Sequence, residues 1–179
     1  MKTSISDILK NSWPYGLILG AVSIVISLIM YILDVNMFSI TFAIFSFLVI
    51  LIGIPATIGI LGMNNLRAKF ATDRTISYLD ALIACLVIFL IGFLLSNLYS
   101  YLFYTYLDPA YLKAQMQKMV EMLEKYNLPQ DKIDETIEKT QKGFQIGRML
   151  LTSLITSSVM ALILSLFVRK KDKFDDKII

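Results

Sequence analysis

The sequence predicts an all-α integral membrane protein: a four-helix bundle with an extracytoplasmic, amphipathic helical hairpin between the third and fourth spans. Three observations predict this fold. Hydrophobic residues make up 56% of the chain and charged residues 17%, the apolar residues gather in four uncharged blocks, and a charged segment of helical periodicity separates the last two blocks. About 20 apolar residues cross the ~30 Å hydrocarbon layer as a helix. Helices of a soluble core would keep a polar face, and these blocks keep none.

The four blocks define the expected spans within a single membrane domain of residues 1–179. Their polar and aromatic flanks place the spans at about residues 14–33, 38–62, 78–104 and 149–168. The first block is too long for a signal peptide and lacks a small-residue cleavage site, so we expect it to be retained. Tyr99 and Tyr104 follow the third apolar run, as expected where a span meets the lipid headgroups.

Glycine and proline in the first two spans affect how these helices pack. Gly16 and Gly20 form a GxxxG pattern that lets another helix approach closely, and packing inside one bundle is favoured over a dimerisation signal. Pro14 is expected in the first turn of its span, where a missing N–H is harmless. Pro55 lies inside the second span and predicts a kink near Gly53, because proline removes a hydrogen bond and clashes with the preceding turn.

Polar and small residues in the third and fourth spans are interpreted mainly as packing contacts. Asp80, at the start of the third span, complements the helix N-terminus or pairs with a basic residue of the preceding loop; the alternative is an ion or substrate contact in a transporter. Asn97 is able to bond across helices. The clearest packing face consists of small residues at four-residue intervals in the fourth span: Ser153, Ser157, Ala161 and Ser165.

Residues 108–148 are expected to form the helical hairpin outside the membrane. Asp108 is a suitable cap for a helix that begins at Pro109, and apolar residues follow at helical spacing. The sequence Asn127-Leu128-Pro129 ends this helix, and nothing forces the second helix to stop before the fourth span. The hairpin caps the bundle, lies on the membrane surface, or pairs with another copy of the chain or another membrane protein. Association is ranked first, because the apolar stripe of the hairpin needs cover.

The distribution of Lys and Arg predicts the orientation. The N-terminal lead, the loop at 64–80 and the C-terminal tail hold ten Lys/Arg and six Asp/Glu, whereas the turn at 34–36 and the hairpin hold seven and eight. Cytoplasmic loops collect Lys and Arg, so both termini are expected in the cytoplasm.

The chain offers little for catalysis. It contains no histidine, so it cannot form a Ser/His/Asp or Cys/His set, and Cys85 lies in an apolar run that leaves a thiol inert. A metal site would need carboxylates alone, and no glycine-rich phosphate loop is present. Basic residues are scattered among acids, which does not favour nucleic-acid binding. We therefore expect no catalytic residue, no cofactor and no metal, with the lipid bilayer as the main partner.

The chain resembles a family of uncharacterised bacterial inner-membrane proteins, known only as a four-span domain of unknown function. The resemblance rests on ISYLDA at 76–81, on LDPAY at 107–111, and on the hairpin, the fourth span and the lysine-rich end. It implies the four-span topology and a bacterial inner membrane, and offers no activity or cofactor. We expect a non-enzymatic structural or accessory membrane protein that acts through helix packing with itself or a partner. The alternative is a small transporter or channel for an ion or small molecule, suggested by Pro55 and the polar residues of the spans.

Overall fold

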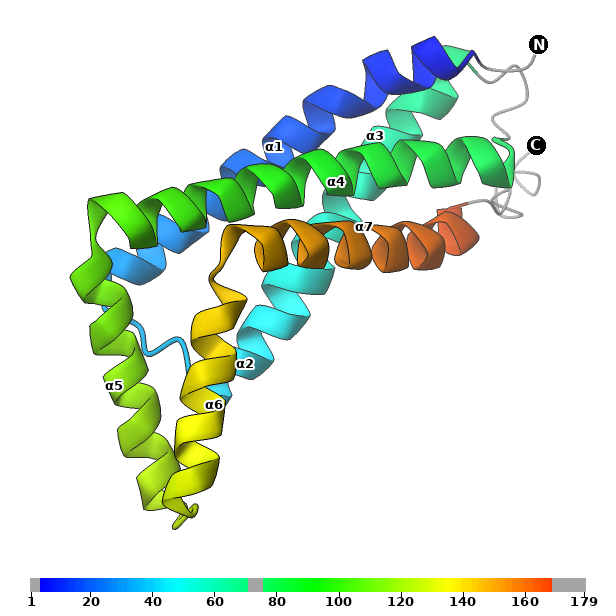
Figure 1. Cartoon of the computed structure of the whole chain (residues 1–179). Coiled ribbons are helices and arrows are strands. Elements are labelled where there is room, and N and C mark those ends of the chain that lie inside the picture. Colours follow the sequence, from blue (N-terminus) through cyan, green and yellow to red (C-terminus); the bar gives the residue numbers. More distant parts are fainter. Residues whose placement is uncertain (1–3, 71–75, 169–179) are drawn as a thin grey trace.

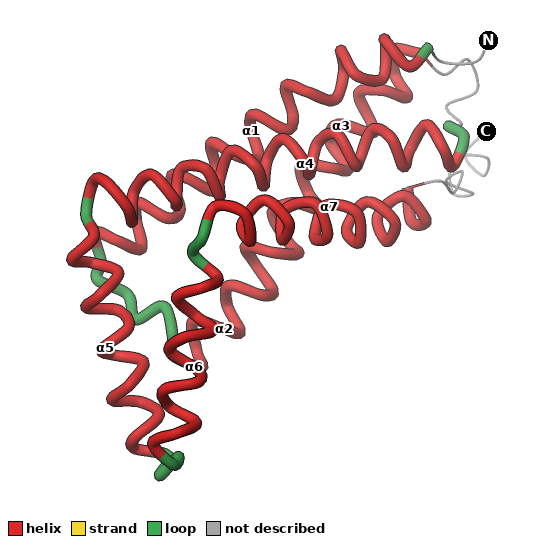
Figure 2. Tube along the Cα trace, viewed as in Figure 1, coloured by secondary structure: helices red, strands yellow, loops and turns green. Residues whose placement is uncertain are grey.

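The computed structural model of the chain describes residues 4–70 and 76–168. Within these residues it contains helices and loops and no strand (Figure 2). The elements are, in chain order, α1 (Ile5–Ile32), α2 (Ile40–Phe45), the π-helical η1 (Ser46–Gly53), α3 (Ile54–Phe70), α4 (Tyr78–Leu102), the π-helical η2 (Phe103–Leu107), α5 (Pro109–Lys125), α6 (Gln130–Gly143) and α7 (Ile146–Val168).

Four helical stretches are long and apolar enough to cross a membrane. They are Ile5–Ile32, Ile40–Lys69, Tyr78–Leu107 and Ile146–Val168. Large apolar side chains remain exposed along these stretches, and lipid covers such faces in a membrane protein. The protein is therefore an all-α, multi-pass membrane protein, which confirms the predicted fold class.

Helix α4 lies at the centre of the bundle (Figure 1). It packs along α1 on one side and α7 on the other, while α3 contacts both α1 and α4. Its first half carries side chains that are fully buried by these neighbours, among them Cys85, Ile88 and Phe89. The tightest part of the core is therefore in the half of the bundle where α1 begins and α7 ends.

Two helices extend further than the sequence predicted. Helix α1 begins at Ile5 rather than near residue 14, and Pro14 lies inside the helix and not in its first turn. The reason is tertiary, because Ile8 is fully buried in the core and this contact keeps the residues before Pro14 helical. The second stretch continues to Phe70 instead of ending near residue 62, since Leu66 is also buried in the core.

The second stretch contains a break of a different kind from the predicted kink. The π-helix η1 ends at Gly53, just before Pro55, and the Ile54 N–H donates to the Val49 carbonyl five residues earlier. In an α-helix a proline ring clashes with the carbonyl four residues before it, and a π turn changes that alignment. Helix α3 packs on the other spans, whereas α2 diverges from α1 and α4 (Figure 1).

The segment between α4 and α7 forms the helices α5 and α6, which lie side by side at the opposite end from the start of α1 (Figure 1). Asn127, with a φ of 55°, makes the turn between them. Met119 of α5 and Ile133 of α6 are buried, so part of the apolar stripe is covered within the chain. Helix α6 ends at Gly143, and a short break separates it from α7.

The exposed face of α6 carries two ion pairs between residues four positions apart. Lys139 Nζ lies 2.6 Å from Glu135 Oε1, and Lys142 pairs with Glu138. Hydrogen bonds from these lysines are the main reason why the pKa of both carboxyl groups lies below its usual value, and the positive charges of the lysines lower it further. These pairs support α6 from its solvent side.

Candidate binding cavity between the spans

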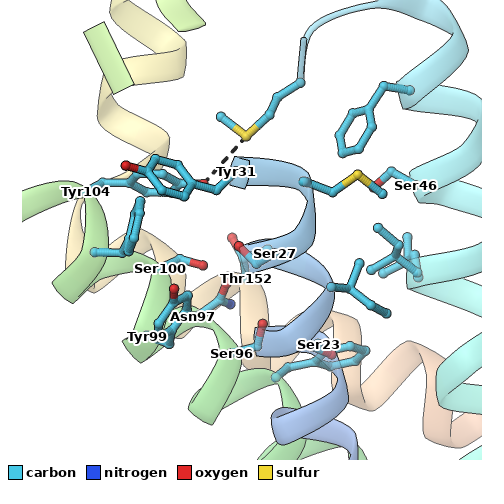
Figure 3. A pocket seen from close by; sticks show the side chains of 18 of the residues that line it. Ser23, Ser27, Tyr31, Ser46, Ser96, Asn97, Tyr99, Ser100, Tyr104 and Thr152 are labelled. Carbon is cyan, nitrogen blue, oxygen red and sulfur yellow. Dashed lines mark hydrogen bonds between the residues drawn. The ribbon is translucent and has the colours of Figure 1, made fainter. Parts of the chain in front are cut away.

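A cavity of about 500 Å³ lies where α2 and η1 diverge from the rest of the bundle (Figure 3). Its walls come from the last turns of α1, from α2 and η1, from the second half of α4 and from the first turns of α7, with η2 and α5 at its outer end. All of these segments belong to the half of the bundle next to α5 and α6. Ligand pockets commonly measure ~300–1,000 Å³, so this space is large enough for a small molecule.

The wall of the cavity formed by α1, α4 and α7 carries several uncharged polar side chains among apolar ones (Figure 3). They are Ser23, Ser27, Ser96, Asn97, Ser100, Thr152, Ser153 and Thr156. We call this set the polar wall. None of the described residues that line the cavity carries a charge. Hydroxyl and amide groups at membrane depth need hydrogen-bond partners. Ser23, Asn97 and Ser153 find theirs within the protein.

The opposite wall, formed by α2 and η1, is mainly apolar. Its side chains include Phe42, Phe47 and Leu51. Phe47 on this side and Thr152 on α7 are both exposed, so the cavity opens sideways between η1 and α7. The site therefore combines a hydrogen-bonding face, a hydrocarbon face and an entrance from the surrounding lipid.

Asn97 joins α4 to α7 beside the cavity. Its Nδ2 donates to Ser153 Oγ at 2.7 Å and to the Met149 carbonyl at 3.3 Å, and Ser153 Oγ donates to the same carbonyl at 2.9 Å. The sequence indicated Asn97 and Ser153 separately as packing residues, and the structure brings them together. The amide donates both hydrogens here, which leaves Asn97 Oδ1 as an acceptor. The hydroxyls of Ser96 and Thr156 take no part in this network.

Helix α1 packs closely on α4 just beyond the inner end of the cavity, whose lining on α1 begins at Ser23. A Cβ added at Gly16 would lie 2.7 Å from Ile91 Cβ, and one at Gly20 would lie 2.6 Å from Leu95 Cδ2. Leu19, between the two glycines, is fully buried. The GxxxG pattern therefore lets α1 pack against α4 of the same chain, and neither glycine lines the cavity.

The outer end is tied to α5 by the loop between α1 and α2. Gln115, which is fully buried, accepts from the Met37 N–H at 3.1 Å and donates to Asp34 Oδ1 at 3.3 Å. Lys118 Nζ pairs with the same carboxylate at 2.8 Å. These contacts hold the loop against the first half of α5.

Aromatic rings line the same end. Tyr31 lies edge-on to Phe103 and Tyr111, with ring centroids 4.9 and 4.8 Å apart, and its hydroxyl donates to Asp108 Oδ2 at 2.9 Å. Asp108 also caps α5, because its Oδ1 accepts from the Tyr111 N–H at 3.0 Å. Burial, and then the negative charge of Asp34, raise the pKa of Tyr111. Tyr111 also lines the cavity.

Residues 14–170 match a family described as a protein of unknown function, DUF4199. The chain belongs to the DUF4199 family. The match takes in most of α1 and every later helix, so it includes the whole cavity and confirms the family predicted from the sequence. No curated protein and no solved structure matches this DUF4199 protein.

Other residues indicated by the sequence of this DUF4199 protein lie away from the cavity. Ser157, Ala161 and Ser165 are buried on α7. Asp80 lies in the first turn of α4, where its N–H donates to Ser77 Oγ at 3.1 Å. Among the residues that the structure describes, Asp80 forms no ion pair, and residues 71–75 of the preceding loop, which include Arg74, fall outside them.

Pro55 is buried and does not line the cavity, although the π-helix just before it does. Sequence reasoning missed the part that α5 plays in the site of this DUF4199 protein. A signal was available in Gln115, which lies four residues before Met119 on the apolar stripe of α5. A polar residue in such a position, facing the protein, requires a hydrogen-bond partner.

Proposed function

We propose that this protein is a non-enzymatic accessory component of the membrane, which binds a small uncharged molecule in the cavity between its spans. The observation that carries the proposal is the one-ended shape of the cavity. A polar wall faces an apolar wall in the half of the bundle next to α5 and α6, and the lining on α1 begins only at Ser23, beyond the close packing around Gly16 and Gly20. Such a site retains a ligand within one half of the bilayer and offers no path across it.

The residues of the cavity support a binding role over a catalytic one. The described lining residues include serine and threonine hydroxyls, an amide and phenols, but no carboxylate, histidine, lysine or thiol. A serine or threonine hydroxyl is a weak nucleophile unless a general base activates it. The hydroxyls therefore suit hydrogen bonding to a bound molecule.

A small transporter is the second candidate, and one observation favours it. The π-helix η1, followed by Pro55, forms one wall of the cavity, and interrupted helices at membrane depth accompany transport sites in several folds. Transport would require the packing around Gly16, Gly20 and Leu19 to open during the cycle.

We further propose that the protein lies in a bacterial inner membrane with both termini in the cytoplasm. The excess of Lys and Arg in the terminal segments and in the loop at 64–80 supports this orientation. It would place α5 and α6 outside the cytoplasm and the cavity in the outer half of the bilayer. A reporter that is active only outside the cytoplasm, fused near Gln130, should be active; activity of a C-terminal fusion alone would reverse the orientation.

Association through residues 108–148, with another copy or another membrane protein, remains part of the proposal. Burial of Met119 and Ile133 reduces the apolar surface that needs a partner. The exposed apolar residues at the tip of the α5–α6 pair, Tyr126 and Leu128, are the contact that we assign to association. Crosslinking in native membranes from a cysteine placed at Leu128 tests this contact, and the absence of any crosslinked species would remove it from the proposal.

Cysteine accessibility tests the one-ended cavity. In a Cys85→Ala background, Ser100→Cys places a single thiol on the polar wall, and Leu154→Cys places one on the lipid-exposed face of α7 as the control. The protein is reconstituted into vesicles, and a membrane-impermeant thiol reagent is added from one side at a time. We expect modification of Ser100→Cys from the α5–α6 side only, and none of Leu154→Cys. Modification from both sides would favour transport, and modification from neither would rule out an accessible cavity.

A further inference from the structure

We infer that the cavity binds an uncharged lipid with a hydroxyl-bearing polar end and a hydrocarbon tail, of the acylglycerol class, which enters sideways from the half of the bilayer next to α5 and α6. This inference rests on the proposed binding function and names the class of molecule that the site takes. Three properties of the cavity carry it: the absence of charge, the hydrogen-bonding capacity left on the polar wall, and the lateral opening beside an apolar wall.

The lack of charge in the lining disfavours the common phospholipid headgroups. None of the described lining residues is charged, and two carboxylates close to the aromatic rings of the outer end, Asp34 and Asp108, already have partners. Asp34 pairs with Lys118 at 2.8 Å, and Asp108 accepts from Tyr31 and from the start of α5. A phosphate drawn into this site would lose water without gaining a counter-charge, which is strongly unfavourable. The polar end of the bound molecule is therefore neutral.

The hydrogen-bonding groups on the polar wall exclude a plain hydrocarbon. Ser96, Ser100 and Thr156 line the same cavity, and their hydroxyls lie outside the Asn97 network. An acyl chain alone would leave these groups without partners in a medium that contains little water. A molecule with oxygen atoms at one end would satisfy them.

The acceptor on Asn97 distinguishes a hydroxyl-bearing molecule from one with carbonyl groups only. Both hydrogen bonds found for this amide are donated by Nδ2, so Oδ1 is available to accept one. A carbonyl oxygen cannot donate, whereas a hydroxyl both donates and accepts. Glycerol-type hydroxyls therefore fit this wall better than ketones, esters or quinones alone.

The lateral opening accommodates the tail. Phe42, Phe47 and Leu51 form an apolar surface opposite the polar wall, and the exposed Phe47 and Thr152 mark the side where the cavity meets lipid. The cavity of about 500 Å³ needs to contain only the polar end and the first part of the chain. The remainder of the chain extends into the bilayer and stays in hydrocarbon.

Two lipids that differ only at the headgroup test the inference directly. Purified full-length protein in detergent is mixed with dioleoylglycerol or with dioleoylphosphatidic acid, and bound lipid is measured by native mass spectrometry. We expect dioleoylglycerol to bind and to resist competition by dioleoylphosphatidic acid, which carries the same acyl chains with a phosphate in place of the hydroxyl. Equal or tighter binding of dioleoylphosphatidic acid would overturn the inference.

Variants locate the bound lipid. Ser96→Ala with Ser100→Ala should weaken dioleoylglycerol binding about tenfold, because each removes one hydrogen bond to the polar end. Thr156→Val is an independent variant on α7, and we expect it to weaken binding about two- to tenfold. Ser158→Ala is the matched control, since the Ser158 hydroxyl is exposed on α7 and donates to the Leu154 carbonyl away from the cavity. Equal binding by all four proteins would place the lipid elsewhere and overturn the inference.

The cysteine experiment separates failure of this inference from failure of the proposed function. If Ser100→Cys is modified from the α5–α6 side alone and dioleoylglycerol does not bind, the binding cavity stands and the acylglycerol class is wrong. If Ser100→Cys is modified from both sides, the one-ended cavity itself is wrong, whatever lipid binds.

Discussion

Replacing Gly16 with alanine should destabilise the protein by forcing α1 away from α4. The new Cβ would lie 2.7 Å from Ile91 Cβ and 3.0 Å from the Ile88 carbonyl oxygen, whereas carbon atoms pack best at about 3.5–4.0 Å. The shortfall is therefore about 1 Å, and neither neighbouring atom is the free end of a flexible side chain. Overpacking of this kind costs about 1–3 kcal/mol, and we expect the upper part of that range.

Gly147 supplies the matched control, because a Cβ added there has no atom within 4 Å. Gly16 lies inside α1, where alanine gains up to about 1 kcal/mol in helix propensity, whereas Gly147 lies in the first turn of α7, where this gain is smaller. The difference between the two variants is then a lower bound on the steric cost of the seam, which we expect at about 2–3 kcal/mol. Reversible unfolding in mixed micelles, with helicity followed by circular dichroism, measures it. Equal stabilities for Gly16→Ala and Gly147→Ala would refute the reasoning.

Three further predictions concern the polar contacts. Asn97→Ala should lower the free energy of unfolding by about 1 kcal/mol, since its α7 partner keeps a bond to a backbone carbonyl; a loss above about 3 kcal/mol in the same unfolding assay would contradict this. Gln115→Leu leaves a backbone N–H of the α1–α2 loop unpaired and should lower the free energy of unfolding by about 1–3 kcal/mol. Lys118→Gln removes a largely exposed ion pair and should lower it by less than about 1 kcal/mol. A larger loss for Lys118→Gln than for Gln115→Leu would refute the view that Gln115 is the main contact between the loop and α5. The pKa values of Glu135 and Glu138 on α6 are lower in the folded protein than the unperturbed value of 4.5. Their ion pairs therefore stabilise α6 fully above pH 4.5, and this stabilisation is lost as the pH falls through the lowered pKa values. Hydrogen exchange of α6 should therefore accelerate in acid, and Lys139→Gln with Lys142→Gln should remove most of that pH dependence.

The spans were predictable from the sequence because burial in lipid is a local property. Each apolar block is long enough to require a bilayer whatever its neighbours do, so four membrane-length helices followed from composition and length alone. The helix ends were predicted less well. Ile8 and Leu66 lie beyond the expected span ends, next to the charged residues Asp7 and Arg67. Only contact with other helices keeps them buried, and no local sequence pattern predicts such contacts.

Some residues of the cavity could be predicted from the sequence, but the cavity itself could not. Asn97 and Ser153 carried the right signal, polar or small side chains inside apolar spans. Their joint position depends on which faces of α4 and α7 meet and on how far η1 diverges from α1. These are properties of packing between segments that are far apart in the chain, here 52 to 56 residues for the bonds of Asn97.

The sequence by itself determined that this chain enters a membrane, how often it is able to cross, and that it belongs to a four-span family of unknown function. Only the tertiary structure decided that Gly16 and Gly20 pack inside the chain, that Pro55 is accommodated by a π-helix, and that hydroxyls from three helices face one space. The physical reason is the range of the interactions. Transfer of apolar groups into lipid acts on each segment separately, whereas close packing and hydrogen bonding depend on partners that the fold alone brings together.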